Sequence, residues 1–372
     1  MKVGVITFSN SRDNYGQILQ CYAMQIFVRN LGHSPYLIRY NETIKDPTGF
    51  KLANLHKYIF KLPVYIKWYI DRLRHKKIEK RYSSIAAYHD RKFDEFIKKR
   101  IDSTELLYGP ETIINNPPEA DAYICGSDQI WGGSWPYYLS FAPDAAIKIA
   151  YAPSLGGLTS FTPEYEREMK RLLSRLDFIG MREQSGVDTC IKLGFPETKK
   201  VVDPTLLLDA EDYRSIAVDH KSSSPYLFCY LLGNPTSCRI GDVYDYANSH
   251  KLDVKYVANQ RIDNFPKIYP TIEDWIGYIA AADRVVTNSF HCVVFSLILH
   301  KPVIYLPLNE GYERMNCRID ELLNSTGLER LRYQGDLAKV DLSNIDFKRF
   351  DDWKQQEVSR SLSILSNLLK KS

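Results

Sequence analysis

The sequence predicts an α/β protein in which two Rossmann-like domains face a cleft, and three observations favour this fold. The chain has 372 residues, 44% hydrophobic and 25% charged, which is typical of a globular protein with room for two cores. Residues 3–40 follow a strand, loop, helix and strand pattern. A second series of short apolar runs and helical patterns begins near residue 178, so we expect a second sheet there.

The first domain is expected at residues 1–165. Its strands are predicted at residues 3–8, 35–40, 121–125 and 147–153, and its helices at 18–31 and 163–176, the latter at the boundary. Residues 51–100 are helical in pattern, basic and aromatic, which indicates an insertion. Residues 51–81 hold ten Lys and Arg against two acidic residues, while the whole chain carries only +4. One anionic contact surface is therefore favoured over general nucleic-acid binding.

The second domain is expected at residues 166–345, followed by a C-terminal helix within 346–372 that packs back across both domains. Strands are predicted at residues 178–181, 200–202, 226–232, 254–257, 284–287 and 303–306. Helices are predicted at residues 241–250, 272–282, 291–299, 315–326 and 353–369.

Several classes of protein lack support in this sequence. The seven cysteines are scattered without a C-x-x-C pair, and H-E-x-x-H is absent, so we expect no metal site. The phosphate-binding and dinucleotide-binding glycine motifs and G-x-S-x-G are also absent. Neither a secretory signal nor an apolar stretch of membrane-spanning length is found, so we expect a cytoplasmic location.

Polar residues follow the predicted strand at 121–125. Asp128 is a candidate acid or base, with Ser127 and Gln129 as hydrogen-bonding groups, because ligands of open α/β sheets bind beyond the carboxyl ends of strands. The alternative is a simple turn with Trp131 packed beneath it. Asn14, Tyr15 and Gln17 suit recognition of sugar hydroxyls, although loop amides often only cap turns.

A second group follows the predicted strand at 284–287. Ser289 is a good helix N-cap, and the free N–H groups after it make an anion site. His291 in the first turn suits a phosphate donor or a general acid, or else is a satisfied, partly buried histidine. Arg182 also ends a predicted strand and suits phosphate or carboxylate. Arg314, Arg318 and Arg330 could face the cleft or solvent, and Asp203-Pro-Thr205 is interpreted as a structural turn.

Taken together, these segments resemble the polysaccharide pyruvyltransferase family. Six segments carry the resemblance in the expected order over most of residues 3–330, leaving out the basic insertion: NYGQILQCYAMQ, DAYICGSDQIW, YYLSFAPDAAIKIAYAPSLG, FIGMREQSGVD, VVDPTLLL and ADRVVTNSFHCVVFSLILHKPVIYLPL. The resemblance implies a fold like that of the GT-B glycosyltransferases. It also implies transfer of pyruvate from phosphoenolpyruvate to two sugar hydroxyls of a capsular polysaccharide or exopolysaccharide, giving a cyclic ketal and phosphate. Phosphoenolpyruvate would be a co-substrate, and no cofactor is expected.

The resemblance also implies roles for individual residues. His291 would contact phosphate or protonate the donor's methylene carbon, and Asp128 would deprotonate an acceptor hydroxyl. The donor-binding set would be Arg182, Asn288, Ser289, Phe290, Arg314 and Arg318, mainly from the second domain. The acceptor-binding set would be Asn14, Tyr15, Gln17, Ser127, Gln129 and Trp131.

The chain departs from the family pattern beside the histidine. Many members carry Arg where this chain has Ser289, so Arg314 or Arg318 replaces that cation or the donor binds in a different pose. Cys292 stands where Gly is frequent, and its larger side chain would narrow the space beside the phosphate.

Residues 56–81 interleave aromatic and basic side chains. This pattern is typical of interfacial helices on anionic lipid, so peripheral membrane contact is expected. The family resemblance implies a polyprenyl-diphosphate-linked acceptor, because related enzymes often act on sugars carried in this way. The alternative is a basic hairpin that covers the first sheet. Two other functions stay open: a GT-B-like glycosyltransferase using a nucleotide sugar, and a non-catalytic scaffold at the membrane surface. Binding of nucleic acid is not expected.

Overall fold

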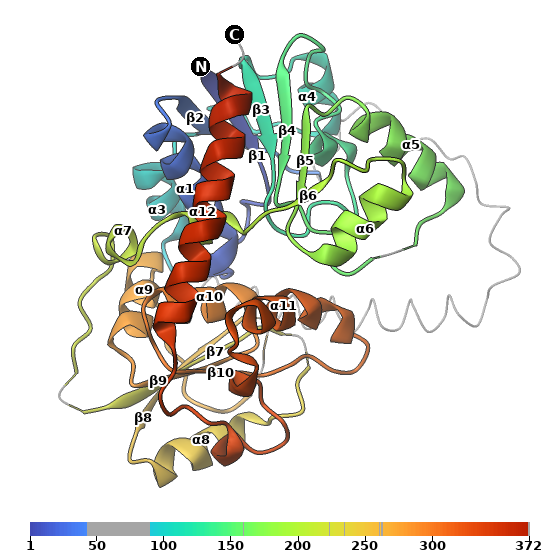
Figure 1. Ribbon diagram of the computed structural model, residues 1–372. Coiled ribbons are helices and arrows are strands. Elements are labelled where there is room, and N and C mark those ends of the chain that lie inside the picture. Colours follow the sequence, from blue (N-terminus) through green and yellow to red (C-terminus); the bar gives the residue numbers. More distant parts are fainter. Residues whose placement is uncertain are drawn as a thin grey trace, which may run out of the picture.

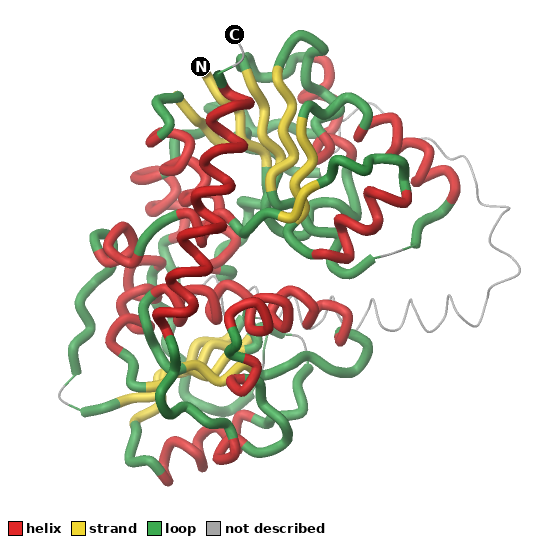
Figure 2. The backbone as a smooth tube through the Cα atoms, in the orientation of Figure 1, coloured by secondary structure: helices red, strands yellow, loops and turns green. Residues whose placement is uncertain are grey.

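The computed structural model describes residues 1–42, 90–158, 160–222, 224–233, 235–259, 261 and 263–370. These residues form two α/β units, each built on its own parallel sheet (Figure 1). Figure 2 shows the strands of the two sheets in yellow, with helices packed around each. The predicted two-domain α/β fold is confirmed.

The first sheet has six parallel strands in the order β2-β1-β3-β4-β5-β6. The strands are β1 Lys2–Ile6, β2 Ser34–Leu37, β3 Ala122–Cys125, β4 Ile147–Tyr151, β5 Phe178–Met181 and β6 Lys199–Lys200. The accompanying helices are α1 Tyr15–Asn30, α3 Phe93–Arg100, α4 Pro110–Asn115, η3 Trp135–Tyr138, α5 Pro163–Leu173 and α6 Gln184–Lys192. Strand β3 is an unbroken buried run, as expected where helices cover both faces of a parallel sheet.

The second sheet has four parallel strands in the order β10-β9-β7-β8. The strands are β7 Tyr226–Leu231, β8 Asp253–Ala258, β9 Arg284–Thr287 and β10 Val303–Tyr305. The helices from η4 to the end of the chain are η4 Pro204–Leu207, α7 Ala210–Arg214, α8 Ile240–Ser249, α9 Ile272–Ala281, α10 Phe290–Ile298, η5 Glu313–Asn316, α11 Cys317–Thr326, η6 Glu329–Leu331, η7 Leu337–Lys339 and α12 Phe347–Leu369.

Strands β5 and β6 belong to the first sheet, which corrects the predicted division between residues 165 and 166. Strand β5 pairs in parallel with β4, and β6 pairs with β5. Helix α5 connects β4 to β5, so this crossover returns the chain to the next position in the same sheet. The second sheet therefore begins only at β7, after η4 and α7.

Residues 93–100, predicted as part of the basic insertion, instead contribute to the core as α3. Phe93 packs edge-on against Tyr15, with ring centroids 5.0 Å apart, and Phe96 packs against Tyr22 at 5.7 Å. Residues 51–89 of the predicted insertion lie outside the described residues.

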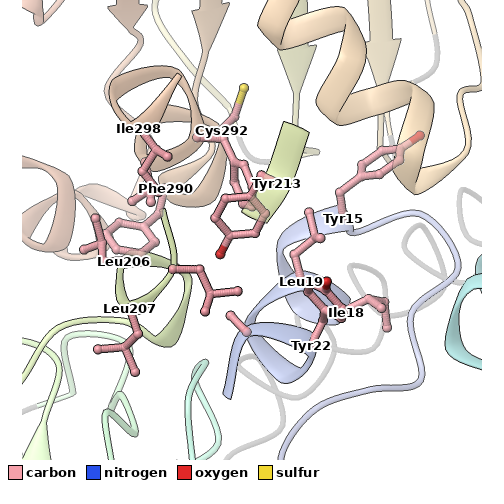
Figure 3. Close-up of a cluster of buried hydrophobic side chains, with 14 of the residues drawn as sticks. Tyr15, Ile18, Leu19, Tyr22, Leu206, Leu207, Tyr213, Phe290, Cys292 and Ile298 are labelled. Carbon is pink, nitrogen blue, oxygen red and sulfur yellow. The ribbon is translucent and has the colours of Figure 1, made fainter. Parts of the chain in front are cut away.

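One hydrophobic core continues from the first unit into the second (Figure 3). Tyr15, Ile18, Leu19 and Tyr22 of α1, Leu206 and Leu207 of η4, Tyr213 of α7, and Phe290, Cys292 and Ile298 of α10 all contribute to this core. Shared burial of this kind fixes α1 against α10, because separating the two helices would expose apolar surface from both units to water.

Helix α12 runs along both units (Figure 1). It packs on α10 and α11 of the second unit, and the hydroxyl of Tyr151 in β4 donates to Ser361 Oγ of α12 at 2.9 Å. Lys354 Nζ of α12 donates to Asp209 Oδ1 at 2.7 Å, just before α7. None of the helices in the described ranges has the length and apolar content needed to cross a membrane.

Candidate active site

The carboxylate of Asp203 collects partners from both units. Its Oδ1 accepts from the backbone N–H and hydroxyl of Thr205 at 3.0 and 2.6 Å, which caps η4. Its Oδ2 accepts from Ser127 Oγ at 2.7 Å and Arg182 Nη1 at 2.8 Å. His291 Nε2 of the second unit lies 3.5 Å from the same oxygen. Asp203 therefore contacts both the histidine of the second unit and the residues at the strand ends of the first unit.

These partners lower the pKa of Asp203. Burial alone would raise it, but His291, Arg182 and Thr205 together outweigh burial and hold the pKa of Asp203 well below its ordinary value. Asp203 is therefore ionised across the physiological range, and its negative charge lies beside the His291 ring.

Strand ends bring these groups together. Ser127 and Asp128 follow β3, Arg182 follows β5, Asp203 follows β6, and His291 lies in the first turn of α10 after β9. In parallel sheets such ends meet at one edge, where open α/β proteins bind ligands. The sequence predicted a strand end at each of these groups, but it interpreted Asp203 as part of a structural turn and not as a site residue.

Gly16 allows the first unit to approach His291 closely. A Cβ atom at Gly16 would lie 2.2 Å from Cγ and Nδ1 of the His291 ring. Only a residue without a side chain fits there, so the start of α1 forms one wall against the imidazole.

A cleft of about 270 Å³ lies between the two units beside His291. It is lined by these predicted site residues: Asn14, Gln17, Asp128, Gln129, Asn288, Ser289, Phe290, His291 and Arg318. The structure therefore gathers residues distant in sequence, from the first α1 turn to α11, around one space.

The second-unit wall of the cleft is suited to an anion. Ser289 caps α10, and its side chain accepts from Cys292 N–H at 3.4 Å. The N–H groups of a first helical turn have no intrahelical acceptor, and the helix dipole favours negative charge there. The Arg318 guanidinium lies 5.7 Å from the Phe290 ring centroid and also borders the cleft. Burial and the nearby charge of Arg182 lower the pKa of Arg318.

Asp128 stands on the first-unit wall. Its Oδ1 accepts from Gln129 N–H at 2.8 Å, and its Oδ2 accepts from Gln17 Nε2 at 3.4 Å. The residue adopts a left-handed conformation with φ of +69°, which aspartate tolerates better than most residues. These contacts fix a carboxylate on the side of the cleft opposite α10.

Two predicted acceptor-binding residues are core residues instead. Trp131 is fully buried, stacks on Tyr138 with centroids 4.8 Å apart, and donates through Nε1 to Tyr137 O. Tyr15 is fully buried against Trp275, and its hydroxyl donates to a backbone carbonyl. Neither side chain lines the cleft, since both are enclosed in the core.

Other predicted contacts also have different surroundings. Ser127 is buried and donates to Asp203, while the Asn288 amide bonds Leu232 through both Oδ1 and Nδ2. Arg182 lies behind Phe290, 5.2 Å from its ring centroid, and does not line the cleft. Arg314 lines a neighbouring cavity of about 330 Å³. Of the two arginines expected to stand in for the cation missing at Ser289, only Arg318 borders the cleft.

Asp203 was missed because Asp-Pro-Thr is a common turn sequence. The available signal was a carboxylate at the end of a strand next to the strand that carries Arg182. Within the described ranges, no group of three or more His, Cys, Asp and Glu side chains could hold a metal ion.

A protein-family model described as polysaccharide pyruvyl transferase matches residues 14–310 of this chain. The match spans well over half of the sequence and contains Asp128, Arg182, Asp203 and His291. No curated protein sequence matches the chain.

Solved structures give a likeness of fold. A candidate UDP-N-acetylglucosamine 2-epimerase from Listeria monocytogenes aligns over 100% of this chain and 97% of its own, with 9% identity and a TM-score of 0.54. The UDP-N-acetylglucosamine 2-epimerase from Rickettsia bellii aligns over 99% and 97%, with 11% identity and a TM-score of 0.49. A Streptomyces glycosyltransferase complexed with thymidine diphosphate aligns over 100% of both chains, with 12% identity and a TM-score of 0.44. The architecture is GT-B-like, as the family resemblance implied.

Proposed function

Because this chain belongs to the polysaccharide pyruvyl transferase family, we propose that it transfers pyruvate from phosphoenolpyruvate to two hydroxyls of one sugar. The product is a cyclic pyruvate ketal in a surface polysaccharide. Membership of the family supports pyruvate transfer in polysaccharide biosynthesis, and the phosphoenolpyruvate donor and the ketal are the proposed detail.

The observation that carries the proposal is the pairing of an anion-binding wall with a carboxylate across one cleft. The first turn of α10 and Arg318 suit a compact, densely negative donor. Asp128 faces this wall from the first unit, where it can receive a proton from a sugar hydroxyl.

The chemistry proceeds as an addition and then a displacement at the same carbon. His291 protonates the methylene carbon of phosphoenolpyruvate, which leaves an oxocarbenium-like centre at C2. The first hydroxyl bonds to C2 as Asp128 takes its proton. The second hydroxyl then bonds to C2 as the C2–O bond to phosphate breaks, and its proton leaves with the phosphate.

Asp203 and Arg182 act through His291 in this scheme. The Asp203 carboxylate lies 3.5 Å from His291 Nε2 and places a negative charge beside the ring that donates the proton. Arg182, with Nη1 2.8 Å from Asp203 Oδ2, fixes that carboxylate and is a positioning residue. This arrangement differs from direct contact between Arg182 and the donor, which the family resemblance implied.

We also propose a lipid-linked sugar as acceptor, with the enzyme docked on an anionic membrane through residues 56–81. That segment lies outside the described residues. Its alternation of basic and aromatic side chains is the support for this part of the proposal.

Donor binding tests the assignment. Calorimetric titration with phosphoenolpyruvate should show saturable binding, and His291→Ala should weaken it by about tenfold, the loss expected for one charge-assisted hydrogen bond. His300→Ala is the matched control, because His300 lies exposed just after α10 and pairs with Asp351. Binding of a nucleotide sugar instead of phosphoenolpyruvate would identify a glycosyltransferase. Liposome binding without any donor binding would identify a scaffold.

A further inference from the structure

The cavity of about 330 Å³ that Arg314 lines, here called the side cavity, adjoins the cleft. Phe8, Gln129 and Met315 line both spaces, so a ligand in the cleft can continue into the side cavity. Its volume is in the range of small-molecule sites. Of the acceptor-binding residues that the family resemblance implied, only Gln129 lines it. The proposed transfer takes place in the cleft and leaves the side cavity without a role.

Two consecutive glycines open the side cavity. Gly132 and Gly133 line it in the loop after β3, and both are exposed. Neither has the positive φ that favours glycine. A Cβ atom at Gly133 would lie 3.9 Å from Glu42 Oε2, the nearest atom outside the adjacent residues. One at Gly132 would lie 3.4 Å from Leu158 Cδ1, an ordinary contact distance. Neither backbone conformation nor packing requires glycine here, and the missing side chains leave room for a ligand.

Aromatic side chains form another wall of the side cavity. Phe8 and Tyr137 both line it, and their rings pack edge-on with centroids 5.0 Å apart. Tyr40 packs edge-on against Tyr137 at 5.3 Å, and its hydroxyl is hydrogen-bonded to Ser134 Oγ at 2.7 Å. These contacts fix the wall before a ligand binds, which lowers the entropy cost of binding. The C–H groups of a sugar ring are apolar and pack well on such a wall.

The polar side chains of the side cavity suit a neutral ligand that carries hydroxyl groups. Glu42 supplies a carboxylate, Arg314 a guanidinium and Gln129 an amide. One negative and one positive group leave the wall without net charge, unlike the anion-binding wall of the cleft. None of these three side chains has a hydrogen-bond or ion-pair partner in the part of the chain that the structure describes. Their donors and acceptors are therefore available to hydroxyl groups, which both donate and accept.

We propose that the side cavity is a subsite for a neutral sugar unit bonded to the sugar that receives pyruvate. The acceptor is then an oligosaccharide of at least two units, with the reacting unit in the cleft and its neighbour in the side cavity. This inference rests on the proposed function, because that function places the reacting sugar in the cleft.

The subsite also sets the order of reactions. An enzyme that binds the neighbouring unit distinguishes an assembled saccharide from a free monosaccharide, because only the former fills both spaces. The glycosidic bond between the two units must therefore exist before pyruvate is added. A glycosyl transfer is the class of reaction that supplies this acceptor.

Calorimetric titration of the full chain with sugars, with and without phosphoenolpyruvate, tests the subsite. The probes are the disaccharides lactose, cellobiose and maltose and their units, glucose and galactose. At least one disaccharide should bind the wild type at least about tenfold more tightly than either of its units, because the second unit adds contacts in the side cavity.

Variants locate that gain in the side cavity. Gly133→Leu fills the space and should remove the gain, while binding of the monosaccharides and of phosphoenolpyruvate stays unchanged. Gly241→Leu in α8 is the matched control, since its nearest atom is also 3.9 Å away and it lines neither space. Arg314→Gln should weaken disaccharide binding about three- to tenfold. Its control is Arg167→Gln, at an exposed position of α5 that lines neither space. Unchanged melting temperatures show that the variants fold.

The proposal is overturned if no disaccharide binds more tightly than its units, or if Gly133→Leu binds the disaccharide as tightly as the wild type does. It is also overturned if Gly133→Leu weakens the monosaccharides to the same extent, because the cleft would then be the only sugar site. Binding of uridine diphosphate that Gly133→Leu removes would overturn it in favour of a nucleotide site. A wild type that gains affinity from the second sugar unit but ignores phosphoenolpyruvate supports the subsite and contradicts only the proposed donor.

Discussion

Replacing Arg182 by methionine leaves the Asp203 carboxylate buried without its closest cation. The two side chains are 2% and 0% exposed, and Nη1 lies 2.8 Å from Oδ2. Removing one partner of a buried ion pair costs about 3–5 kcal/mol, because the remaining charge keeps its desolvation penalty and loses its attraction. We expect Arg182→Met to lower the free energy of unfolding by about this amount near neutral pH.

The loss should depend on pH in a defined direction. In the folded wild type the pKa of Asp203 is held well below its ordinary value, so the pair stabilises the protein above the unfolded pKa of about 3.9. That contribution is lost as the pH falls through the folded pKa. In the variant, Arg182 no longer offsets the desolvation of the Asp203 carboxylate, so the pKa of Asp203 rises. The stability gap between the two proteins should therefore narrow in acid.

Urea unfolding followed by tryptophan fluorescence, at pH 7 and near the unfolded pKa, measures both effects. Asp203→Asn removes the buried charge and is the partner variant for a double-mutant cycle. The double variant should lose clearly less stability than the two single losses added together. This account of the pair is wrong if Arg182→Met loses less than about 1 kcal/mol of stability, which is the value typical of exposed ion pairs. It is also wrong if the two single losses simply add in the double-mutant cycle.

Two further predictions concern the walls of the site. Gly16→Ala should place a methyl group 2.2 Å from His291 Cγ, so we expect about 1–3 kcal/mol lower stability and weaker donor binding. Gly241→Ala in α8 is the control, because the nearest atom to its new methyl group is 3.9 Å away. This variant should leave donor binding intact and stabilise the protein by up to about 1 kcal/mol. If the two alanine variants behave alike in unfolding and calorimetry, the steric argument is wrong. Trp131→Phe loses its bond to Tyr137 O and should cost about 1–3 kcal/mol of stability, with no change in the KM of any acceptor that supports turnover. A raised KM for the acceptor with unchanged stability would instead show that Trp131 contacts the acceptor.

Local sequence patterns predicted the elements well and the strand ends best. The predicted strand at 226–232 is β7 at Tyr226–Leu231, and the predicted N-cap Ser289 begins α10. Asp128 and His291 border the cleft because their positions follow from the strand, turn and helix sequence around them. Such local signals need no knowledge of the rest of the fold.

Pairings between distant segments were the part that sequence could not supply. Nothing in residues 178–181 states that β5 pairs with β4 rather than with a strand of the second unit. Trp131 and Tyr15 carry the same polar atoms whether they meet a sugar or a backbone carbonyl, and only the fold decides between these partners. Asp203 became a central residue only when Arg182 and His291 were brought to it from different elements.

The chain crosses between the two units twice, first through η4 and α7 and then along α12. The two crossings contact each other, and Lys354 Nζ joins them through Asp209 at 2.7 Å. A pair of domains joined by one linker could swing in any direction. Two adjacent crossings, together with the core that α1 and α10 share, instead resist such movement and hold the two walls of the cleft in one arrangement.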